Sequence, residues 1–283
     1  MRKFALLLIF LPITVLICFS AVGCSDKKPT PSTVAADSLM TDTTAADTME
    51  AIISETPMPK AADELFDDFI FNFAANRKLQ FSRIKFPLQV IQGKEVTMLE
   101  KKNWKMEHFF MRQGFYTLIF DNRRQMDLVK DTSVSQVTIE KIFLRRNWVN
   151  KYVFDRINGQ WMLVSLHKEA MVQNTNVSFL KFYQRFSTDS LYQIESMNDE
   201  VTFTAPDPDN DFDDITGTMY PDQWPDFKPA LIPRNAIYNI IYGQKYTESN
   251  QKIFVIRGIA NGLETEMTFR RKNGQWKLMK FNY

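Results

Sequence analysis

Two stretches of the chain carry large apolar residues at the spacing of a helix. In each, the apolar positions fall at i, i+3, i+4 and i+7, and the polar residues between them lie off this stripe. The stripes are Phe66, Phe69, Ile70 and Phe73 in the first stretch and Phe179, Phe182, Tyr183 and Phe186 in the second. We predict two helices with aromatic faces in the core, because a buried Phe contributes about 2–3 kcal/mol. A cofactor or sugar platform is the alternative reading of such a stripe.

The end of the chain alternates apolar and polar residues, as a strand with one wet face does. Leu263, Thr265, Met267 and Phe269 alternate with charged residues and a threonine. Asn273-Gly274 follows, a pair that readily takes positive φ at both centres of a type I′ turn. We therefore predict a hairpin in which Trp276 covers the core.

This hairpin motif occurs twice. Residues 154–161 (FDRINGQW) return as residues 269–276 (FRRKNGQW), so Trp161 and Trp276 are 115 positions apart. Other landmarks keep similar offsets: 113 for the two aromatic stripes, 120 for Trp104 and Trp224, 122 for Phe115 and Ile237, and 111 for Lys141 and Lys252. A period near 110 residues suits a small domain rather than a solenoid unit. The sequence predicts two similar halves, residues 62–172 and 173–283.

The two copies differ after the tryptophan. Residues 161–166 (WMLVSL) are apolar on both faces, whereas the last strand keeps Lys277 and Lys280. We expect the face with Met162, Val164 and Leu166 to pack against the other half.

The first 23 residues have the pattern of a secretory signal: Arg2 and Lys3, an apolar run, and small residues before Cys24. They resemble a bacterial lipoprotein signal, in which cleavage leaves the cysteine acylated, although Ala21 stands where leucine is usual. An uncleaved membrane anchor is the alternative, but Pro12 interrupts a run that is already short.

Residues 24–61 are rich in Ser, Thr, Ala, Pro and Asp and contain no aromatic residue. We interpret them as a disordered tether with a reach of about 30–35 Å. Within it, Ser38, Thr43 and Thr48 each follow an Asp and precede Leu, Thr or Met. These triplets resemble the O-glycosylation sequon of some Gram-negative anaerobes.

Charge and cysteine content exclude several classes of function. The chain has 35 basic and 33 acidic residues, and removal of Arg2 and Lys3 with the signal leaves 33 of each. A neutral chain outside the cytoplasm does not suit nucleic-acid binding. Cys18 would leave with the signal and Cys24 would carry lipid, which excludes thiol catalysis, disulfides and cysteine metal sites.

A helix followed by strands that close on a Gly-x-Trp hairpin resembles the nuclear-transport-factor-2-like superfamily. The resemblance rests on Asn158 to Leu163 and on Asn273 to Leu278. It implies an α+β fold of two tandem cone-shaped (cystatin-like) domains, each a helix packed on a curved antiparallel sheet. The stretch from Phe66 to Ala74, with Gln80 and residues 83–88 (RIKFPL), resembles more narrowly an uncharacterised family of tandem lipoproteins from gut Gram-negative anaerobes. This second resemblance implies no particular activity.

Some members of the superfamily are isomerases or dehydratases with a carboxylate base and a Tyr or His acid. Tyr116, Asp121, Tyr238 and Tyr242 are the candidate pocket residues here, and ordinary strand positions are the alternative. His108 and His167 fit no acid–base spacing, and no hydrolase, P-loop or zinc-protease motif is present.

An acidic stretch has the alternating carboxylates of a calcium loop: Asp207, Asp209, Asp211 and Asp213. Phe212 stands where the sharp turn of such a loop needs Gly, and Thr218 where it needs Glu. An exposed acidic loop is the simpler interpretation, and we expect no other cofactor.

Together these features predict a non-enzymatic envelope lipoprotein, anchored through lipid on Cys24, in the outer membrane on its periplasmic face or at the cell surface. We expect it to bind a small ligand, a glycan or a protein partner in a cone pocket or the cleft between halves, and not nucleic acid. A pocket enzyme of isomerase, dehydratase or hydrolase type is the alternative.

Overall fold

The two halves of the chain repeat one order of elements. The computed structural model describes residues 63–207, 209–247 and 249–283. The first half contains α2 (Phe66–Ala75), α3 (Arg77–Ser82), β1 (Ile84–Gln92), β2 (Glu95–Leu99), η2 (Lys101–Asn103), β3 (Phe115–Phe120), η3 (Arg123–Lys130), β4 (Gln136–Phe143), η4 (Leu144–Arg146), β5 (Trp148–Ile157), β6 (Gln160–Ala170) and η5 (Met171–Gln173). The second contains α4 (Val177–Phe186), α5 (Ser190–Glu195), β7 (Met197–Asp207), β8 (Asn210–Met219), η6 (Pro221–Gln223), α6 (Trp224–Phe227), β9 (Ala236–Ile241), β10 (Gln251–Gly258), β11 (Glu264–Lys272) and β12 (Gln275–Asn282).

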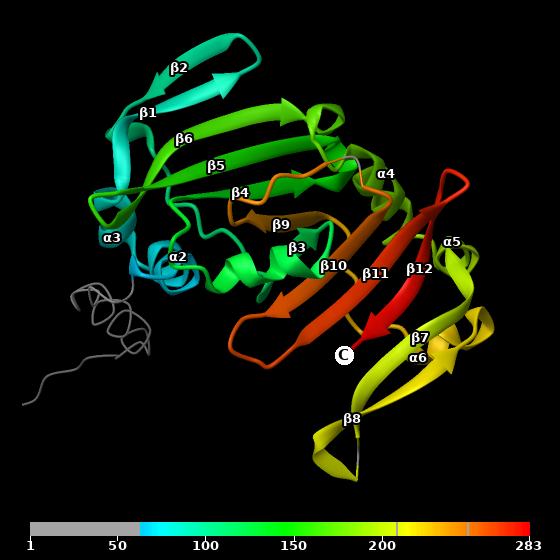
Figure 1. Cartoon of the computed structure of the whole chain (residues 1–283). Coiled ribbons are helices and arrows are strands. Elements are labelled where there is room, and N and C mark those ends of the chain that lie inside the picture. Colours follow the sequence, from blue (N-terminus) through cyan, green and yellow to red (C-terminus); the bar gives the residue numbers. More distant parts are fainter. Residues whose placement is uncertain (1–62, 208, 248) are drawn as a thin grey trace, which may run out of the picture. The chain divides into compact units, whose positions relative to one another are not determined.

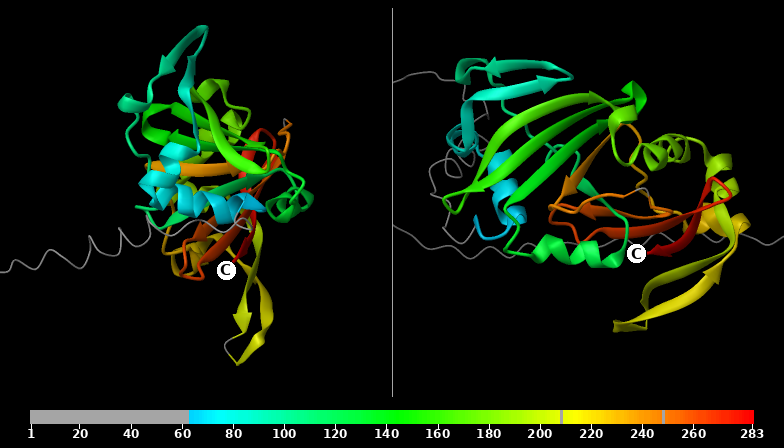
Figure 2. Two further views of the ribbon diagram at one scale, coloured as in Figure 1. Left: turned by 90° about the vertical axis from the view of Figure 1, so that its left-hand side faces the viewer. Right: turned by 45° about the horizontal axis from the view of Figure 1, so that its top comes forward.

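All twelve of these strands belong to one sheet (Figure 1). Its order is β2-β1-β6-β5-β4-β9-β3-β10-β11-β12-β7-β8. The β1–β2 and β7–β8 hairpins lie at the two ends of the sheet, and β7–β8 projects beyond it (Figure 2). The fold is therefore mixed α+β, as predicted. The tandem of two cone-shaped domains is not confirmed, because the strands of the two halves share a sheet.

Both predicted helices form, and each begins its half. The aromatic stripes of α2 and α4 are buried, as the helical spacing required. A short second helix follows each of them. Asn76 caps α3 by accepting a hydrogen bond from the Leu79 N–H at 2.9 Å, and Asp189 caps α5 in the same way from Tyr192. These two caps are 113 positions apart, the offset of the aromatic stripes.

Both predicted hairpins form as well, as β5–β6 and β11–β12. The turn residues Asn158 and Gly159 have φ of 51° and 78°, and Asn273 and Gly274 have 49° and 80°, as a type I′ turn requires. Trp161 is 1% exposed. The repeated motif therefore has a structural role, as the Asn-Gly turn and the core position of the tryptophan predicted.

Between the two halves, one strand of each is exchanged. β3, from the first half, pairs antiparallel with β10 of the second half. β9, from the second half, pairs antiparallel with β4 of the first. The exchanged strands β3 and β9 meet in parallel at Thr117 and Asn239. Each half therefore depends on the other to complete its own row of strands.

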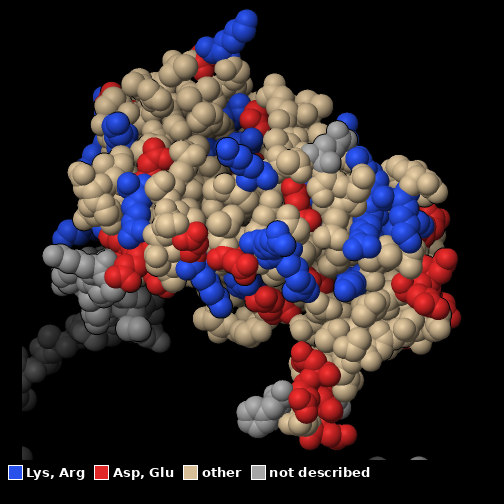
Figure 3. Space-filling model, viewed as in Figure 1, with Lys and Arg blue, Asp and Glu red and all other residues tan. Residues whose placement is uncertain are grey.

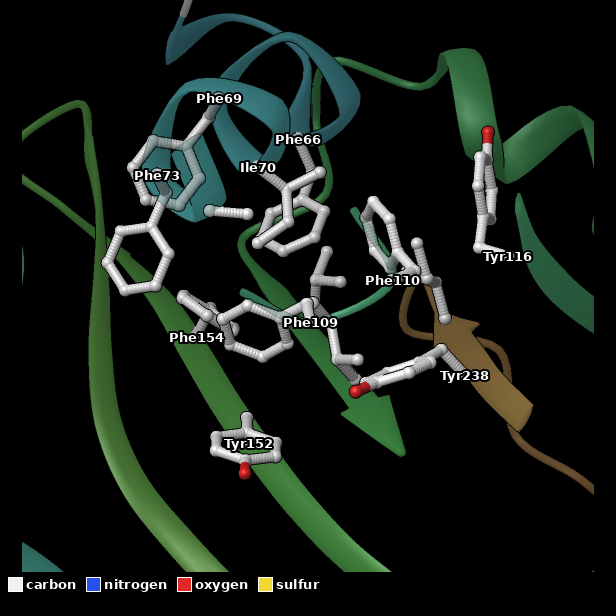
Figure 4. Close-up of a cluster of buried hydrophobic side chains, with 14 of the residues drawn as sticks. Phe66, Phe69, Ile70, Phe73, Phe109, Phe110, Tyr116, Tyr152, Phe154 and Tyr238 are labelled. Carbon is white, nitrogen blue, oxygen red and sulfur yellow. The ribbon is translucent and has the colours of Figure 1, made fainter. Parts of the chain in front are cut away.

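The exchange places two cores on opposite faces of the central strands. Alternate residues of β10 show this: Ile253 and Val255 join the core under α2, whereas Phe254 and Ile256 join the core under α4. Figure 4 shows the first of these cores, in which the α2 aromatics lie against Phe154 of β5, and Tyr238 of β9 lies beside Phe110. Burial on both faces explains why β3 and β9 read as continuous apolar runs.

Buried polar groups fasten the exchanged strands. Asn239 on β9 accepts a hydrogen bond from the Ile119 N–H at 2.9 Å and donates one to Glu140 Oε2, also at 2.9 Å. Asn174 donates to the other oxygen of Glu140 at 2.7 Å. The Glu140 side chain is 1% exposed, so these amides are its main hydrogen-bond donors. Burial raises the pKa of Glu140, and nearby Lys151 opposes that shift.

The structure corrects part of the repeat alignment. Val137 pairs with Phe154, and Lys252 pairs with Phe269, the same place in the second hairpin. Lys252 therefore corresponds to Val137 and not to Lys141, so the offset of 111 was wrong. The exchanged strands begin at Phe115 and Ala236, which gives 121 instead of 122.

The prediction that Met162, Val164 and Leu166 form one face packed against the other half is also wrong. The pairing of β5 with β6 shifts between Val153 and Phe154, and this irregularity changes the alternation of side chains. Leu163 and Leu166 consequently both join the core under α2, and Leu166 is 6% exposed. Met162 and Val164 are half-buried.

Candidate functional site

The best candidate site is built on the segment between η2 and β3. Gln80, fully buried on α3, holds this segment in place with four hydrogen bonds. Its amide donates to Phe73 O and Glu107 O at 3.0 and 2.9 Å, and its oxygen accepts from Trp104 Nε1 and the Glu107 N–H at 2.9 and 3.0 Å. Gln193 and Trp224 repeat this clamp in the second half at 3.0 Å.

Backbone strain marks the same segment. Phe109 has φ of 47°, a left-handed conformation that is unusual for an aromatic residue. Its N–H donates to Glu107 Oε1 at 3.1 Å, and its ring lies 4.9 Å from that of Tyr152. Such strain costs about 1–3 kcal/mol and tends to occur at functional sites.

Glu107 is surrounded by donors. Lys141 Nζ lies 3.1 and 3.2 Å from its two oxygens, and the Tyr152 hydroxyl donates to Oε2 at 3.1 Å. With the Phe109 N–H, this carboxylate accepts four hydrogen bonds. Burial, followed by the negative charge of Glu107, raises the pKa of Tyr152 well above its ordinary value.

The second half supplies one wall of the site. Tyr238 on β9 pairs with Lys141 on β4, and Lys141 Nζ lies 5.3 Å from the centre of the tyrosine ring. Burial opposes the charge on Lys141, but the Tyr238 hydroxyl and Glu107 outweigh it and raise the pKa of the ammonium. The lysine therefore stays charged at neutral pH.

These groups line a cavity of about 250 Å³. Its polar lining comes from Glu107, His108, Arg112, Gln113, Lys141 and Tyr238. Arg112 is exposed at the rim and makes no hydrogen bond or ion pair within the described part of the chain. Two cations against one carboxylate leave the cavity with a positive charge. The arrangement suits a small anionic ligand that can also contact aromatic rings.

The structure places three of the four predicted pocket residues on one face of the sheet. Tyr116, Tyr238 and Tyr242 all join the core under α2, and Figure 4 shows Tyr116 and Tyr238 on neighbouring strands. Of these three, Tyr238 lines the cavity described above. The Tyr242 hydroxyl donates to Asp67 Oδ1. Burial and the charge of Asp67 raise the pKa of Tyr116 to about 12.

Asp121 does not join the tyrosines. Its side chain lies on the other face of the sheet and pairs with Lys252, which also donates to Asn176 Oδ1 at 2.6 Å. Both members of the pair are buried, and they come from different halves. Burial lowers the pKa of Lys252, and Asp121 opposes that shift.

The acidic stretch forms the tip of the β7–β8 hairpin. Asp207 Oδ1 accepts a hydrogen bond from the Asp209 N–H at 2.9 Å, and Asn210 donates to Asp213 at 2.6 Å. The Asp211 side chain lies outside the described part. Among the described residues, no group of three or more His, Cys, Asp or Glu side chains is placed to hold a metal ion.

The N-terminal predictions lie outside the described residues, namely Cys24 and the candidate glycosylation sites Ser38, Thr43 and Thr48. Among the residues that the structure describes, no helix is long and apolar enough to cross a membrane.

The sequence missed Lys141, Glu107 and Arg112 as site residues. One signal was available, because Glu140 and Lys141 put adjacent charges on the two faces of a strand that has no other charged residue. Glu107 and Arg112 lie in a segment without helical or strand periodicity, so no pattern connected them to Lys141.

The comparisons with known proteins agree with the fold. The chain is similar to an NTF2-like protein from Bacteroides fragilis whose crystal structure is solved, with 40% sequence identity and a TM-score of 0.74. The alignment covers 80% of this chain and 98% of that one. None of the curated proteins is significantly similar to the chain. A family model described as a domain of unknown function, DUF4348, matches residues 45–283. The chain therefore belongs to the DUF4348 family and shares its fold with an NTF2-like protein.

Proposed function

We propose that this protein is a non-enzymatic binding protein that holds a small anionic ligand in the cavity beside Lys141. The observation that carries the proposal is a positively charged cavity with both halves in its walls. Lys141 is held by Glu107 and Tyr238, and Arg112 makes no hydrogen bond or ion pair with the described residues. A carboxylate at the rim would pair with Arg112, and Phe109 and Tyr238 would contact an apolar body.

A pocket enzyme is the second candidate, favoured by a carboxylate that lies beside a tyrosine hydroxyl. Glu107 and Tyr152 have this arrangement in the cavity, and Asp67 and Tyr242 have it deeper in the core. A general base, however, needs a free lone pair directed at the substrate. Glu107 already accepts four hydrogen bonds, two of them from Lys141, so we favour binding over proton abstraction.

The sequence supports the envelope as the place where binding occurs. We propose that Cys24 carries lipid, that residues 24–61 tether the folded part to the outer membrane, and that the folded part is a pair of NTF2-like repeats. Incorporation of labelled palmitate by the wild type and not by Cys24→Ser would support the anchor. Equal labelling of both would contradict it.

Calorimetry with benzoate and its neutral analogue benzamide tests the binding proposal. We expect benzoate to bind and benzamide to bind at least about tenfold more weakly, because a charge-assisted hydrogen bond contributes about 1.5–3 kcal/mol. Arg112→Gln should remove most of this preference. Lys105→Gln, an exposed lysine in the same segment, is the matched control and should leave it unchanged.

Two results would contradict the proposal. If the wild type and Arg112→Gln bound benzoate equally, the charge of the cavity would have no part in binding. If benzoate, acetate and phosphate all failed to bind, the cavity would not be an anion site. Turnover of a carbonyl or ester substrate that Glu107→Gln abolishes would favour the enzyme instead.

A further inference from the structure

A second polar surface lies on the sheet face opposite to α4. Core residues of β11 and β12, such as Phe269 and Leu278, point to the α4 side. The alternate residues form a cross-strand row on the other face, in which Thr202 pairs with Lys280 and Lys280 pairs with Thr268. Thr268 is 7% exposed and lines a hollow on this face.

This hollow is a cavity of about 220 Å³. Arg123, Thr202, Gln251, Thr268, Arg270 and Lys280 supply most of its polar lining, and Glu200 is its acid. Glu266 pairs with Arg123 beside it, so three cations face two carboxylates and the hollow keeps a net positive charge. Figure 3 shows Lys and Arg side chains gathered over β11 and β12, well apart from the acidic tip of β7–β8.

Two of the cations are held in position by the protein. Arg123, which the first half contributes, places Nη2 2.6 Å from Glu266 Oε1. Arg270 donates from Nε to Gln251 Oε1 at 3.0 Å. Each of these guanidinium groups keeps further N–H donors that have no acceptor in the described part of the chain.

Lys280 lies between them with no hydrogen bond or ion pair among the described residues. Its neighbours in the row, Thr202 and Thr268, carry hydroxyl groups. Oriented guanidinium donors, an exposed ammonium and hydroxyls together match the oxygens of a multivalent anion.

We propose that this hollow is a second ligand site, separate from the cavity beside Lys141, and that it binds a small multivalent anion such as a phosphate ester or a di- or tricarboxylate. Its volume equals that of about seven waters at roughly 30 Å³ each, which suits a ligand of this size. The dependence on Arg123 makes it a site that exists only when the two halves share their sheet.

Calorimetry with inorganic phosphate and with citrate tests the proposal on the purified chain. We expect at least one of the two anions to bind. The anion with the higher affinity shows whether the ligand is a phosphate ester or a di- or tricarboxylate. Lys280→Gln and Arg270→Gln should each weaken that binding about tenfold, the effect of losing one charge-assisted hydrogen bond. Lys181→Gln, an exposed lysine on α4 and so on the other face, is the matched control.

Arg112→Gln separates the two sites, because it should leave this affinity unchanged even if the cavity beside Lys141 binds nothing. Melting curves of all variants show that they fold. Absence of binding by both anions would overturn the proposal. So would equal losses in Lys181→Gln and Lys280→Gln, or binding that Arg112→Gln removes.

Discussion

The buried ion pair between Asp121 and Lys252 offers a direct test of how tightly the two halves are joined. Their side chains are 6% and 3% exposed, and Lys252 stands where the first half has the core residue Val137. The pair therefore replaces apolar packing with two charges drawn from different halves. Removal of one partner leaves the other charged and buried, which costs about 3–5 kcal/mol.

A double-mutant cycle of Asp121→Leu and Lys252→Met measures how strongly the two charges are coupled. Asp121→Leu also removes the acceptor of the Thr247 N–H, which lies 3.1 Å from Oδ2. Lys252→Met leaves Asp121 with that single N–H as its partner. Each single variant should lose about 3–5 kcal/mol of unfolding free energy, or roughly 6–20 °C in melting temperature for a chain of this size.

The double variant should be more stable than either single variant, because two apolar side chains of similar size can replace a buried pair at little cost. Urea unfolding of the four proteins, with equal m-values, gives the coupling free energy. If each single variant lost less than about 1 kcal/mol, the pair would behave as a hydrated surface pair and not as a buried one. A double variant with the summed loss of both singles would contradict the coupling of the two charges.

Two further predictions concern buried polar groups. Gln80→Ala breaks four hydrogen bonds and Gln193→Ala breaks two. Each buried group left unpaired costs about 1–3 kcal/mol, so urea denaturation should show the larger loss of unfolding free energy for Gln80→Ala. A larger loss for Gln193→Ala would contradict the role of Gln80 in holding the segment around Glu107. Burial raises the pKa of Glu140 above 4.5, so the native state binds the extra proton and its stability falls as pH rises from 4.5 through the native pKa. The melting temperature of the wild type minus that of Glu140→Gln should therefore be larger at pH 4 than at pH 7, with the exposed Glu95→Gln as control. A difference that rises from pH 4 to pH 7 would contradict the shift.

Local patterns predicted the elements of this fold well. Helical spacing identified α2 and α4, and Asn-Gly identified both hairpin turns, since each depends on residues close in sequence. The duplicated motif also predicted a repeated order of elements.

The exchange of strands could not be predicted from these patterns. β3 and β9 are apolar on both faces, so neither alternation nor charge indicates which neighbour each one takes. The repeat itself favoured pairing within each half, because sequential strands usually lie side by side. Alignment by residue type also failed at Lys252, where a lysine replaces a core valine and is neutralised by a residue from the other half.

The candidate site was only partly predictable for the same reason. Tyr238 was identified as a pocket residue, but its partner Lys141 belongs to the other half and reaches it through the exchanged strand β9. A contact of this kind depends on the tertiary arrangement.

The two halves of the sheet are joined by the exchange of β3 and β9, and separate expression of residues 62–172 and 173–283 tests this exchange. We predict that neither half alone unfolds cooperatively as a monomer, because each would lack the strand that covers β4 or β10. Co-expressed halves should form a stable one-to-one complex that melts in a single transition. A half that is monomeric, melts cooperatively by itself and does not bind the other would contradict the exchange.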